Sequence, residues 1–378
     1  MRRIVSARVP FLDLKGPYRE LRAEIDAAMR RVAEGGWYLL GEELRAFEAA
    51  YARRIGVKHC IGVANGLDAL HLSLLAMGIG EGDEVIVPSN TYIATWLAVT
   101  MTGAVPVPVE PDPATYNIDP ALVAAAITRR TKAILPVHLY GLTADMAPIA
   151  EVAAAYGLKV LEDAAQAHGA CYHGRPAGAL ADAAAWSFYP GKNLGAFGDA
   201  GAVTTDDDGI ADRVRVLRNY GSRVKYVNEV RGFNSRLDDL QAAVLAAKLP
   251  HLDLWNARRR RIAERYARGL ADMPLALPAE PPGFQSAWHL YVVRTTDRDA
   301  LRDHLAANGV ETLIHYPIPP HHQAAYADLG FPRDAFPIAR RIHEEVLSLP
   351  IGPHLEDDQQ ERVIVAVASY FSRVRVGT

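Results

Sequence analysis

Cysteine is nearly absent from this sequence of 378 residues, which contains only Cys60 and Cys171. Two cysteines exclude a disulfide framework and a cysteine-based zinc cluster, and they suit a reducing cytoplasm. The sequence also lacks the His-Glu-x-x-His and Cys-x-x-Cys patterns of metal sites, so we expect no metal. It has no apolar run long enough to span a bilayer and no apolar N-terminal segment typical of a signal peptide. We therefore expect a cytoplasmic protein without a membrane partner.

An excess of charge is also missing. The formal net charge is −3, which gives no electrostatic reason to expect nucleic acid as a partner. The arginine run at 258–261 continues a helical pattern with Ile262 and Tyr266 inward, and we interpret it as a solvated helix face. Half of the residues are hydrophobic and 22% are charged, as in ordinary globular proteins. A chain of this length exceeds what one core usually supports, which predicts a large and a smaller domain.

Short apolar runs alternate with helical patterns between residues 60 and 204. The runs lie at 60–63, 84–87, 105–109, 133–137, 159–161, 184–188 and 202–204. Helical patterns lie at 68–77, 91–101, 120–127 and 146–156. Strands that are buried on both faces and separated by helices predict an α/β fold with a mostly parallel sheet. The last two runs have no helix between them, which allows a local antiparallel pair.

The pattern changes beyond about Pro250. A helical pattern at 237–254 is followed by a proline-rich stretch at 274–282 and an apolar run at 289–293. Further helical patterns lie near 300–308, 335–346 and 356–370. We interpret residues 1–249 as a large α/β domain and residues 250–378 as a small C-terminal α+β domain.

Chemically useful side chains follow the strands of the predicted sheet. In open α/β sheets, ligands bind beyond the carboxyl ends of the strands. Gly66 and Leu67 open a helix after the first run, and the amides at such a helix end suit a phosphate. Tyr92 follows the second run. The later runs are followed by Asp163, Gln166, Ser187 and Lys192.

Lys192 lies among four glycines between residues 191 and 201. Glycine lets the backbone approach a bound group closely, and lysine forms Schiff bases with carbonyl compounds such as pyridoxal phosphate (PLP). Taken alone, each feature has another interpretation. The glycine-rich segment also fits a turn with an incidental lysine. Asp163 also fits a helix cap, and Tyr92 also fits packing in the core. A phosphate seat, an aromatic ring, a carboxylate, an amide, a hydroxyl and a lysine at one sheet edge together favour PLP.

Nucleotide-binding motifs fit the sequence poorly. The glycine-rich segment 78–82 precedes a strand instead of following one, and it lacks the G-x-G-x-x-G spacing. Lys192 is not followed by Ser or Thr, so residues 191–193 do not form a Walker motif.

Three motifs, at 162–169, 187–195 and 232–243, resemble those of the DegT/DnrJ/StrS family of nucleotide-sugar aminotransferases. The likeness extends from residue 10 to at least Trp255 and is weaker beyond. The resemblance implies a PLP-dependent enzyme of fold type I, like aspartate aminotransferase, that works as a homodimer with shared active sites.

The resemblance also implies roles for residues in these motifs. Lys192 is similar to the Schiff-base lysine that serves as general acid and base, and Asp163 to the partner of the pyridine nitrogen. Some relatives carry histidine in place of the lysine and perform deoxygenation, so Lys192 favours transamination. Gln166 is implied to contact the phenolic oxygen and Tyr92 to stack on the ring. The implied phosphate contacts are Gly66, Leu67, Ser187 and, from the second subunit, Asn234.

Within the family, the segments 63–70, 90–96, 136–141 and 219–223 resemble enzymes that aminate TDP-3-keto-6-deoxyhexoses at C3. This resemblance implies transfer of an amino group from L-glutamate, giving a TDP-3-amino-3,6-dideoxyhexose. A C4 aminotransferase, a PLP-dependent sugar dehydratase and a non-catalytic sugar-nucleotide sensor are the alternatives. The candidate sugar-binding residues are Tyr220, Ser222, Lys225, Tyr226, Tyr316, His321 and His322. For Tyr316, His321 and His322, packing within a loop is an equal interpretation.

Overall fold

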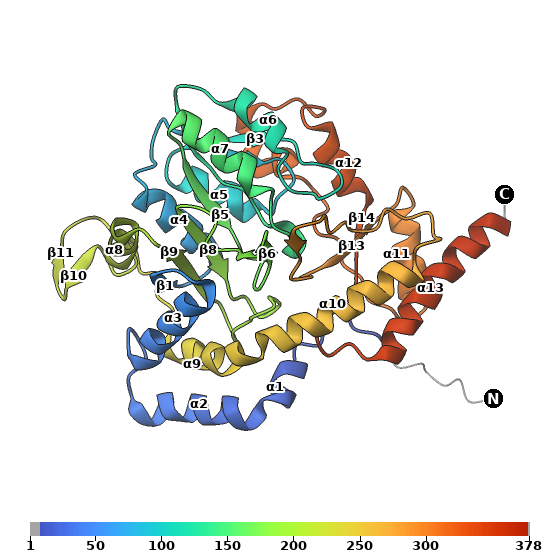
Figure 1. Ribbon diagram of the computed structural model, residues 1–378, viewed down its shortest axis with the longest axis horizontal. Helices are drawn as coiled ribbons and strands as arrows, with labels where there is room; N and C mark the ends of the chain where they lie inside the picture. Colours follow the sequence, from blue (N-terminus) through green and yellow to red (C-terminus); the bar gives the residue numbers. More distant parts are fainter. Residues whose placement is uncertain (1–7, 377–378) are drawn as a thin grey trace.

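The computed structural model describes residues 8–376. Its centre is a seven-stranded sheet in the order β1-β9-β8-β5-β4-β2-β3 (Figure 1). In that order the strands are β1 (His59–Val63), β9 (Gly201–Thr205), β8 (Ala183–Ser187), β5 (Lys159–Asp163), β4 (Thr131–Ile134), β2 (Glu84–Pro88) and β3 (Val105–Val109). Within this sheet, β9 pairs antiparallel with β1 and β8, whereas the other pairs are parallel. The predicted mostly parallel sheet and the antiparallel last pair are confirmed.

Helices cover both faces of the sheet because successive strand residues point to opposite sides. On β8, Ala185 belongs to one hydrophobic core and Trp186 to another. The first face is covered by α4 (Gly66–Ala76), α5 (Ile93–Met101) and α8 (Asp208–Leu217). The second face is covered by α3 (Glu42–Ile55), α7 (Met146–Tyr156) and α9 (Asp239–Lys248). This arrangement leaves the carboxyl ends of the parallel strands available to a ligand.

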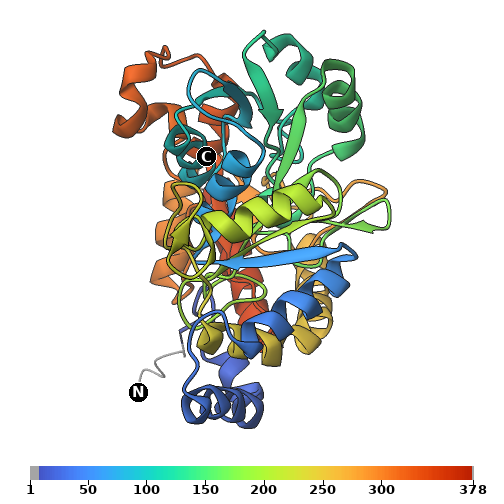
Figure 2. The ribbon, with the colours of Figure 1, turned by 90° about the vertical axis from the view of Figure 1, so that its left-hand side faces the viewer.

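Two predicted helices are interrupted. The pattern at 237–254 forms α9, a 3-10 turn at Leu249–His251 and then α10 (Leu252–Gly269). Pro250 accounts for the interruption, because proline has no amide hydrogen to donate within a helix. The pattern at 120–127 forms the short α6 (Pro120–Val123) and a 3-10 turn. Near the N-terminus, α1 (Gly16–Glu20) leads to α2 (Arg22–Gly35), which packs outside α9 at the lower edge of the molecule (Figure 2).

The C-terminal part contains the antiparallel pair β13 (Tyr291–Arg294) and β14 (Val346–Leu349), with α11 (Arg298–Ala307), α12 (Pro337–Glu345) and α13 (Asp357–Val376). The division at residue 249 stays a prediction, and it falls in the turn between α9 and α10. The remaining strands are β6 (Cys171–Tyr172), β7 (Arg175–Pro176), β10 (Ser222–Val224), β11 (Val227–Asn228) and β12 (Phe284–Gln285). Across residues 8–376, none of the helices is long and apolar enough to cross a membrane.

Candidate active site

A cavity of about 730 Å³ lies at the carboxyl ends of the parallel strands. Its wall combines the sheet edge with a C-terminal segment that includes Leu313 and His315. All seven cofactor contacts predicted within one chain line this cavity. They are Gly66, Leu67, Tyr92, Asp163, Gln166, Ser187 and Lys192.

The N-terminus of α4 forms one end of the cavity. Asn65 caps the helix, because its side-chain oxygen accepts a hydrogen bond from the Asp68 amide at 2.8 Å. The preceding amides, of Gly66 and Leu67, have no partner within the helix and are available to an anion. A Cβ on Gly66 would lie 2.7 Å from the Ser187 Cβ, so only glycine fits against this neighbour. The packing therefore brings the helix end and the Ser187 hydroxyl together as an anion seat.

Asp163 ends β5 and is 6% exposed. Its Oδ2 accepts a hydrogen bond from Thr95 Oγ1 at 2.9 Å, and its Oδ1 accepts one from the Ala165 amide at 3.2 Å. Burial raises the pKa of Asp163, while the Thr95 hydrogen bond and, to a smaller extent, the positive charge of Lys192 lower it. Thr95 therefore helps to keep this carboxyl group ionised, a role that the sequence analysis did not predict.

A buried histidine–glutamate pair supports the strand end that carries Asp163. His138 Nε2 lies 2.8 Å from Glu162 Oε2, and both side chains are fully buried. His138 Nδ1 accepts a hydrogen bond from the Ala144 amide, so the hydrogen of a neutral ring is on Nε2 and points at Glu162. The His138 amide also donates to the Asp163 carbonyl at 3.0 Å. These bonds fix the backbone from which Asp163 projects.

Lys192 faces the cavity from the loop between β8 and β9. Burial lowers the pKa of its amine to about 8, and the Asp163 carboxylate opposes this effect. His289 and His315 line the same cavity, and burial lowers the pKa of both, that of His315 to about 4. Both imidazoles are therefore neutral at pH 7. Near that pH, the Lys192 amine can both release and accept a proton.

Two tyrosines and Gln166 form another part of the wall. The rings of Tyr92 and Tyr316 have centroids 5.0 Å apart, and Tyr92, which lines the cavity, is 52% exposed. Gln166 accepts a hydrogen bond from the Tyr140 amide at 2.6 Å and donates one to the Tyr316 hydroxyl at 2.9 Å. The amide of Gln166 is thus held in one orientation, with one of its two N–H groups still available.

Most predicted sugar-binding residues lie outside the cavity of their own chain. Tyr316 lines it, but four others lie on or beside the β10–β11 hairpin, which projects at one end of the molecule (Figure 1). They are Tyr220, Ser222, Lys225 and Tyr226. Asn234 is also outside, in a β-bridge with Asn219. His321 is buried against Phe336, and His322 follows it in a 3-10 turn. Their roles stay predictions.

His168, within the motif at 162–169, lies behind the cavity. It is fully buried between Trp186 and Phe188, with ring centroids 5.2 and 5.5 Å away. Burial lowers its pKa to about 3, and a hydrogen bond with the Ser187 backbone opposes this effect. This histidine is neutral packing behind the site.

The cavity fits PLP. The anion seat at Gly66 and Ser187 suits the phosphate, and the buried carboxylate of Asp163 suits a protonated ring nitrogen. The exposed face of Tyr92 suits a planar ring, and Lys192 supplies the amine on the remaining side. Across residues 8–376, we find no cluster of three or more potential metal ligands.

Comparisons with known proteins agree with this geometry. The model of the DegT/DnrJ/EryC1/StrS aminotransferase family matches residues 19–368. A curated relative, the dTDP-3-amino-3,4,6-trideoxy-alpha-D-glucose transaminase of Streptomyces venezuelae, is 57% identical over 98% of each chain. The erythromycin biosynthesis sensory transduction protein EryC1 of Saccharopolyspora erythraea is 58% identical over 95% of this chain and 98% of its own.

A solved structure of S. venezuelae DesV in complex with a ketimine intermediate superposes with a TM-score of 0.95. It shares 57% identity and covers 97% of this chain and 99% of its own. The predicted fold class and the PLP cofactor are confirmed by these findings. The chain belongs to the DegT/DnrJ/EryC1/StrS aminotransferase family and is a PLP-dependent aminotransferase.

Proposed function

We propose that this enzyme transfers an amino group from L-glutamate to C3 of a TDP-linked 3-keto-6-deoxyhexose, giving a TDP-3-amino-3,6-dideoxyhexose. The observation that carries the aminotransferase chemistry is Lys192, whose amine shares the cavity with the Asp163 carboxylate. The choice of sugar is supported by the 57% identity with the S. venezuelae transaminase. The name of the EryC1 relative points to a sensor, but a sensor has no need of the lysine and carboxylate found here.

The residues of the cavity have distinct roles in this proposal. When bound, PLP supplies an electron sink that stabilises negative charge on the carbon losing a proton. Asp163 holds a proton at the ring nitrogen, and Thr95 keeps Asp163 ionised. Lys192 removes a proton from the donor carbon and returns one at C3 of the sugar, as its pKa of about 8 permits.

Binding and orientation fall to other residues of the cavity. The amides of Gly66 and Leu67 and the hydroxyl of Ser187 hold the phosphate, while Tyr92 covers one face of the ring. Gln166 directs its free N–H toward the phenolic oxygen, since its carbonyl is already bonded to the Tyr140 amide.

The proposal includes a homodimer with shared sites. Lys192 is the only lysine or arginine among the described residues that line the cavity, yet glutamate carries two carboxylates and the sugar nucleotide carries two phosphates. The segment around Asn234 offers a further cation in Arg236, which in its own chain bonds to the Asn219 side chain and lies over the Tyr220 ring. Large exposed apolar side chains, including Trp37 at 69% and Tyr226 at 87%, suit burial in an interface. In this arrangement each subunit lends Asn234 to the other.

The cellular location in this proposal is the cytoplasm. Both cysteines, Cys60 and Cys171, are free thiols, and Cys60 is buried. Free thiols persist in a reducing compartment, which supports this location.

The test is the reaction with glutamate in the absence of sugar. The enzyme should release one equivalent of 2-oxoglutarate for each site and lose the visible absorbance of its bound cofactor. A sensor would release none. A dehydratase would consume pyridoxamine phosphate and would need a reductant for turnover with the sugar. The Lys192→Ala variant serves as the control, because it should release no 2-oxoglutarate while keeping its fold.

A further inference from the structure

The loop that carries Lys192 has little hydrogen bonding of its own. Between Tyr189 and Gly198, its recorded backbone bonds are Lys192 N to the Tyr189 carbonyl at 2.8 Å and Ala196 N to the Phe188 carbonyl at 2.7 Å. Such an irregular segment needs outside contacts to keep a defined position. The position of the Lys192 amine therefore depends on what holds the loop.

Three side chains from α9 and α10 hold it. Gln241 Oε1 accepts a hydrogen bond from the Phe197 amide at 2.8 Å. Lys248 Nζ donates to the Gly195 carbonyl at 2.6 Å. Asn256 Oδ1 accepts a hydrogen bond from the Asn193 side chain at 2.9 Å. Gln241 and Lys248 are seven residues apart on α9, close to two helical turns, so they lie on the same side of that helix, whereas Asn256 lies on α10.

Lys248 is unusual among the three because it buries a charge. It is 5% exposed, and burial lowers its pKa to about 8. Among residues 8–376, no carboxylate forms an ion pair with Lys248, and its ammonium lies 4.3 Å from the centroid of the Phe197 ring. A buried cation without a counter-ion is unfavourable for folding. The hydrogen bond to the Gly195 carbonyl and the contact with the Phe197 ring offset part of this cost, so we expect Lys248 to contribute little net stability.

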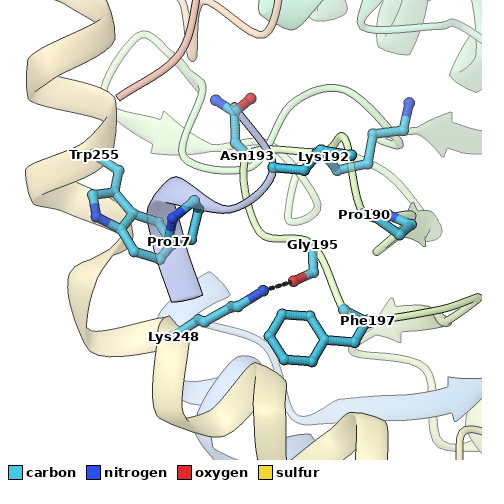
Figure 3. Close-up of a pocket in the computed structure, with 10 residues that line it drawn as sticks. Pro17, Pro190, Lys192, Asn193, Gly195, Phe197, Lys248 and Trp255 are labelled. Atoms are coloured by element: carbon cyan, nitrogen blue, oxygen red, sulfur yellow. Dashed lines mark hydrogen bonds between the residues drawn. The ribbon is translucent and has the colours of Figure 1, made fainter. Parts of the chain in front are cut away.

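The position of Lys248 relative to Lys192 is visible in the structure. The Lys248 side chain extends from α9 to the Gly195 carbonyl, while the Lys192 side chain points away from Lys248 (Figure 3). The contact lies beside a cavity of about 300 Å³ that Pro17 and Trp255 also line. Lys248 thus reaches the backbone of the loop and not the amine of Lys192.

The loop transmits this contact to Lys192. A Cβ on Gly195 would lie 2.5 Å from the Pro190 carbonyl oxygen, so the backbones on the two sides of Lys192 are in direct contact. A shift of Gly195 therefore moves Pro190 as well. Because the amine must stay within reach of both substrates, a displacement of about 1 Å can reduce the rate by about 100-fold.

We propose that Lys248 is a positioning residue for the reaction: it anchors the Gly195 carbonyl and, with Gln241, holds the loop so that the Lys192 amine stays in the cavity. This inference rests on the proposed role of Lys192. It assigns to Lys248 no contact with substrate or cofactor.

The test compares Lys248→Met, which removes the charge and the hydrogen bond but keeps an unbranched side chain one atom shorter than lysine, with Lys132→Met, which removes an exposed lysine from β4. Lys248→Met should lower kcat by about 10- to 100-fold and change KM by less than about twofold. In the cofactor-free protein, hydrogen exchange of residues 189–198 should become faster. The melting temperature at pH 7 should change little, because removal of a buried charge offsets the loss of the hydrogen bond to the Gly195 carbonyl. Lys132→Met should change none of these quantities.

Two further variants complete the test. Lys248→Arg, which restores a charged donor, should recover most of kcat. Gln241→Leu and the double variant Gln241→Leu/Lys248→Met should have similar kcat values, because both side chains hold one loop. If Lys248→Met fails to fold, Gln241→Leu and Lys248→Gln carry the comparison through kcat and hydrogen exchange.

Several results would overturn the inference. One is a parental kcat and parental hydrogen exchange of residues 189–198 in Lys248→Met. A second is a fall in kcat that is matched by a fall in melting temperature. A third is a double variant whose loss of kcat equals the product of the two single losses. Lys192→Ala separates this inference from the proposed function. If Lys192→Ala is inactive and Lys248→Met is not impaired, only the role of Lys248 is wrong. If Lys192→Ala keeps parental turnover, the proposed function itself fails.

Discussion

The hydroxyl of Thr95 provides a quantitative test of how the site keeps Asp163 ionised. Thr95 is fully buried on α5, and its Oγ1 lies 2.9 Å from Asp163 Oδ2 and 2.8 Å from Thr91 Oγ1. The Thr95→Val variant keeps the shape of the side chain and replaces the hydroxyl with a methyl group, which cannot donate a hydrogen bond. Asp163 would then keep the hydrogen bond from the Ala165 amide, which is longer at 3.2 Å.

The expected size of the effect follows from the loss of one hydrogen bond to a charged acceptor. Such a bond contributes about 1.5–3 kcal/mol. At about 1.4 kcal/mol for each pH unit, the pKa of Asp163 should rise by about one to two units. Burial raises the pKa of Asp163, and the Thr95 hydrogen bond opposes this rise. Removal of the hydroxyl therefore raises the pKa further. Because the ionised form is the active one, activity should be lost at low pH and recovered as the pH rises.

The assay is the pH dependence of kcat/KM for the sugar substrate. In Thr95→Val, the acidic limb should move to higher pH by about one to two units, and the plateau above it should stay close to that of the parent. Thr100→Val is the matched control on the same helix, because Thr100 Oγ1 bonds to the Leu97 carbonyl and the Tyr326 hydroxyl. An acidic limb that does not move in Thr95→Val, or that moves equally in Thr100→Val, would refute the reasoning.

Three further variants test other parts of the site. Lys192→Ala should lose essentially all turnover while keeping its far-UV circular dichroism, and near-parental turnover would contradict its assignment. Gly66→Ala should weaken PLP binding by about tenfold or more in an absorbance titration, because the new Cβ would lie 2.7 Å from the Ser187 Cβ; unchanged affinity would contradict the anion seat. Asn234→Ala and Lys192→Ala homodimers, mixed and allowed to exchange, should recover about a quarter of the sites, because half of the dimers are mixed and each has one intact site. With exchange verified independently, activity no greater than the sum of the two variants would exclude a shared site.

Local patterns predicted the part of the site that depends on strand order. Parallel strands end at one edge, so the residues that follow them, such as Asp163 and Lys192, could be placed together from the alternation of strands and helices. The contact between Thr95 and Asp163 could have been predicted by the same reasoning. Thr95 lies four residues after Thr91, on the face of α5 that meets the end of β5.

Other features depend on contacts between distant segments and leave no local signal. Lys248 has the sequence setting of an ordinary helical lysine, and its burial becomes visible only when the loop at Gly195 packs against α9. The His138–Glu162 pair joins residues 24 positions apart. The sequence also could not show that the residues around Tyr226 project away from the cavity of their own chain, because that depends on where the β10–β11 hairpin lies.

The most direct test of the central claim is the position of the new amine in the product. The enzyme is incubated with ¹⁵N-labelled L-glutamate and, in separate reactions, with a TDP-3-keto-6-deoxyhexose and a TDP-4-keto-6-deoxyhexose, and the carbon bonded to the ¹⁵N atom is located by NMR. The proposed function predicts label on C3 of the first sugar and on neither C3 nor C4 of the second. Label on C4 alone would contradict it.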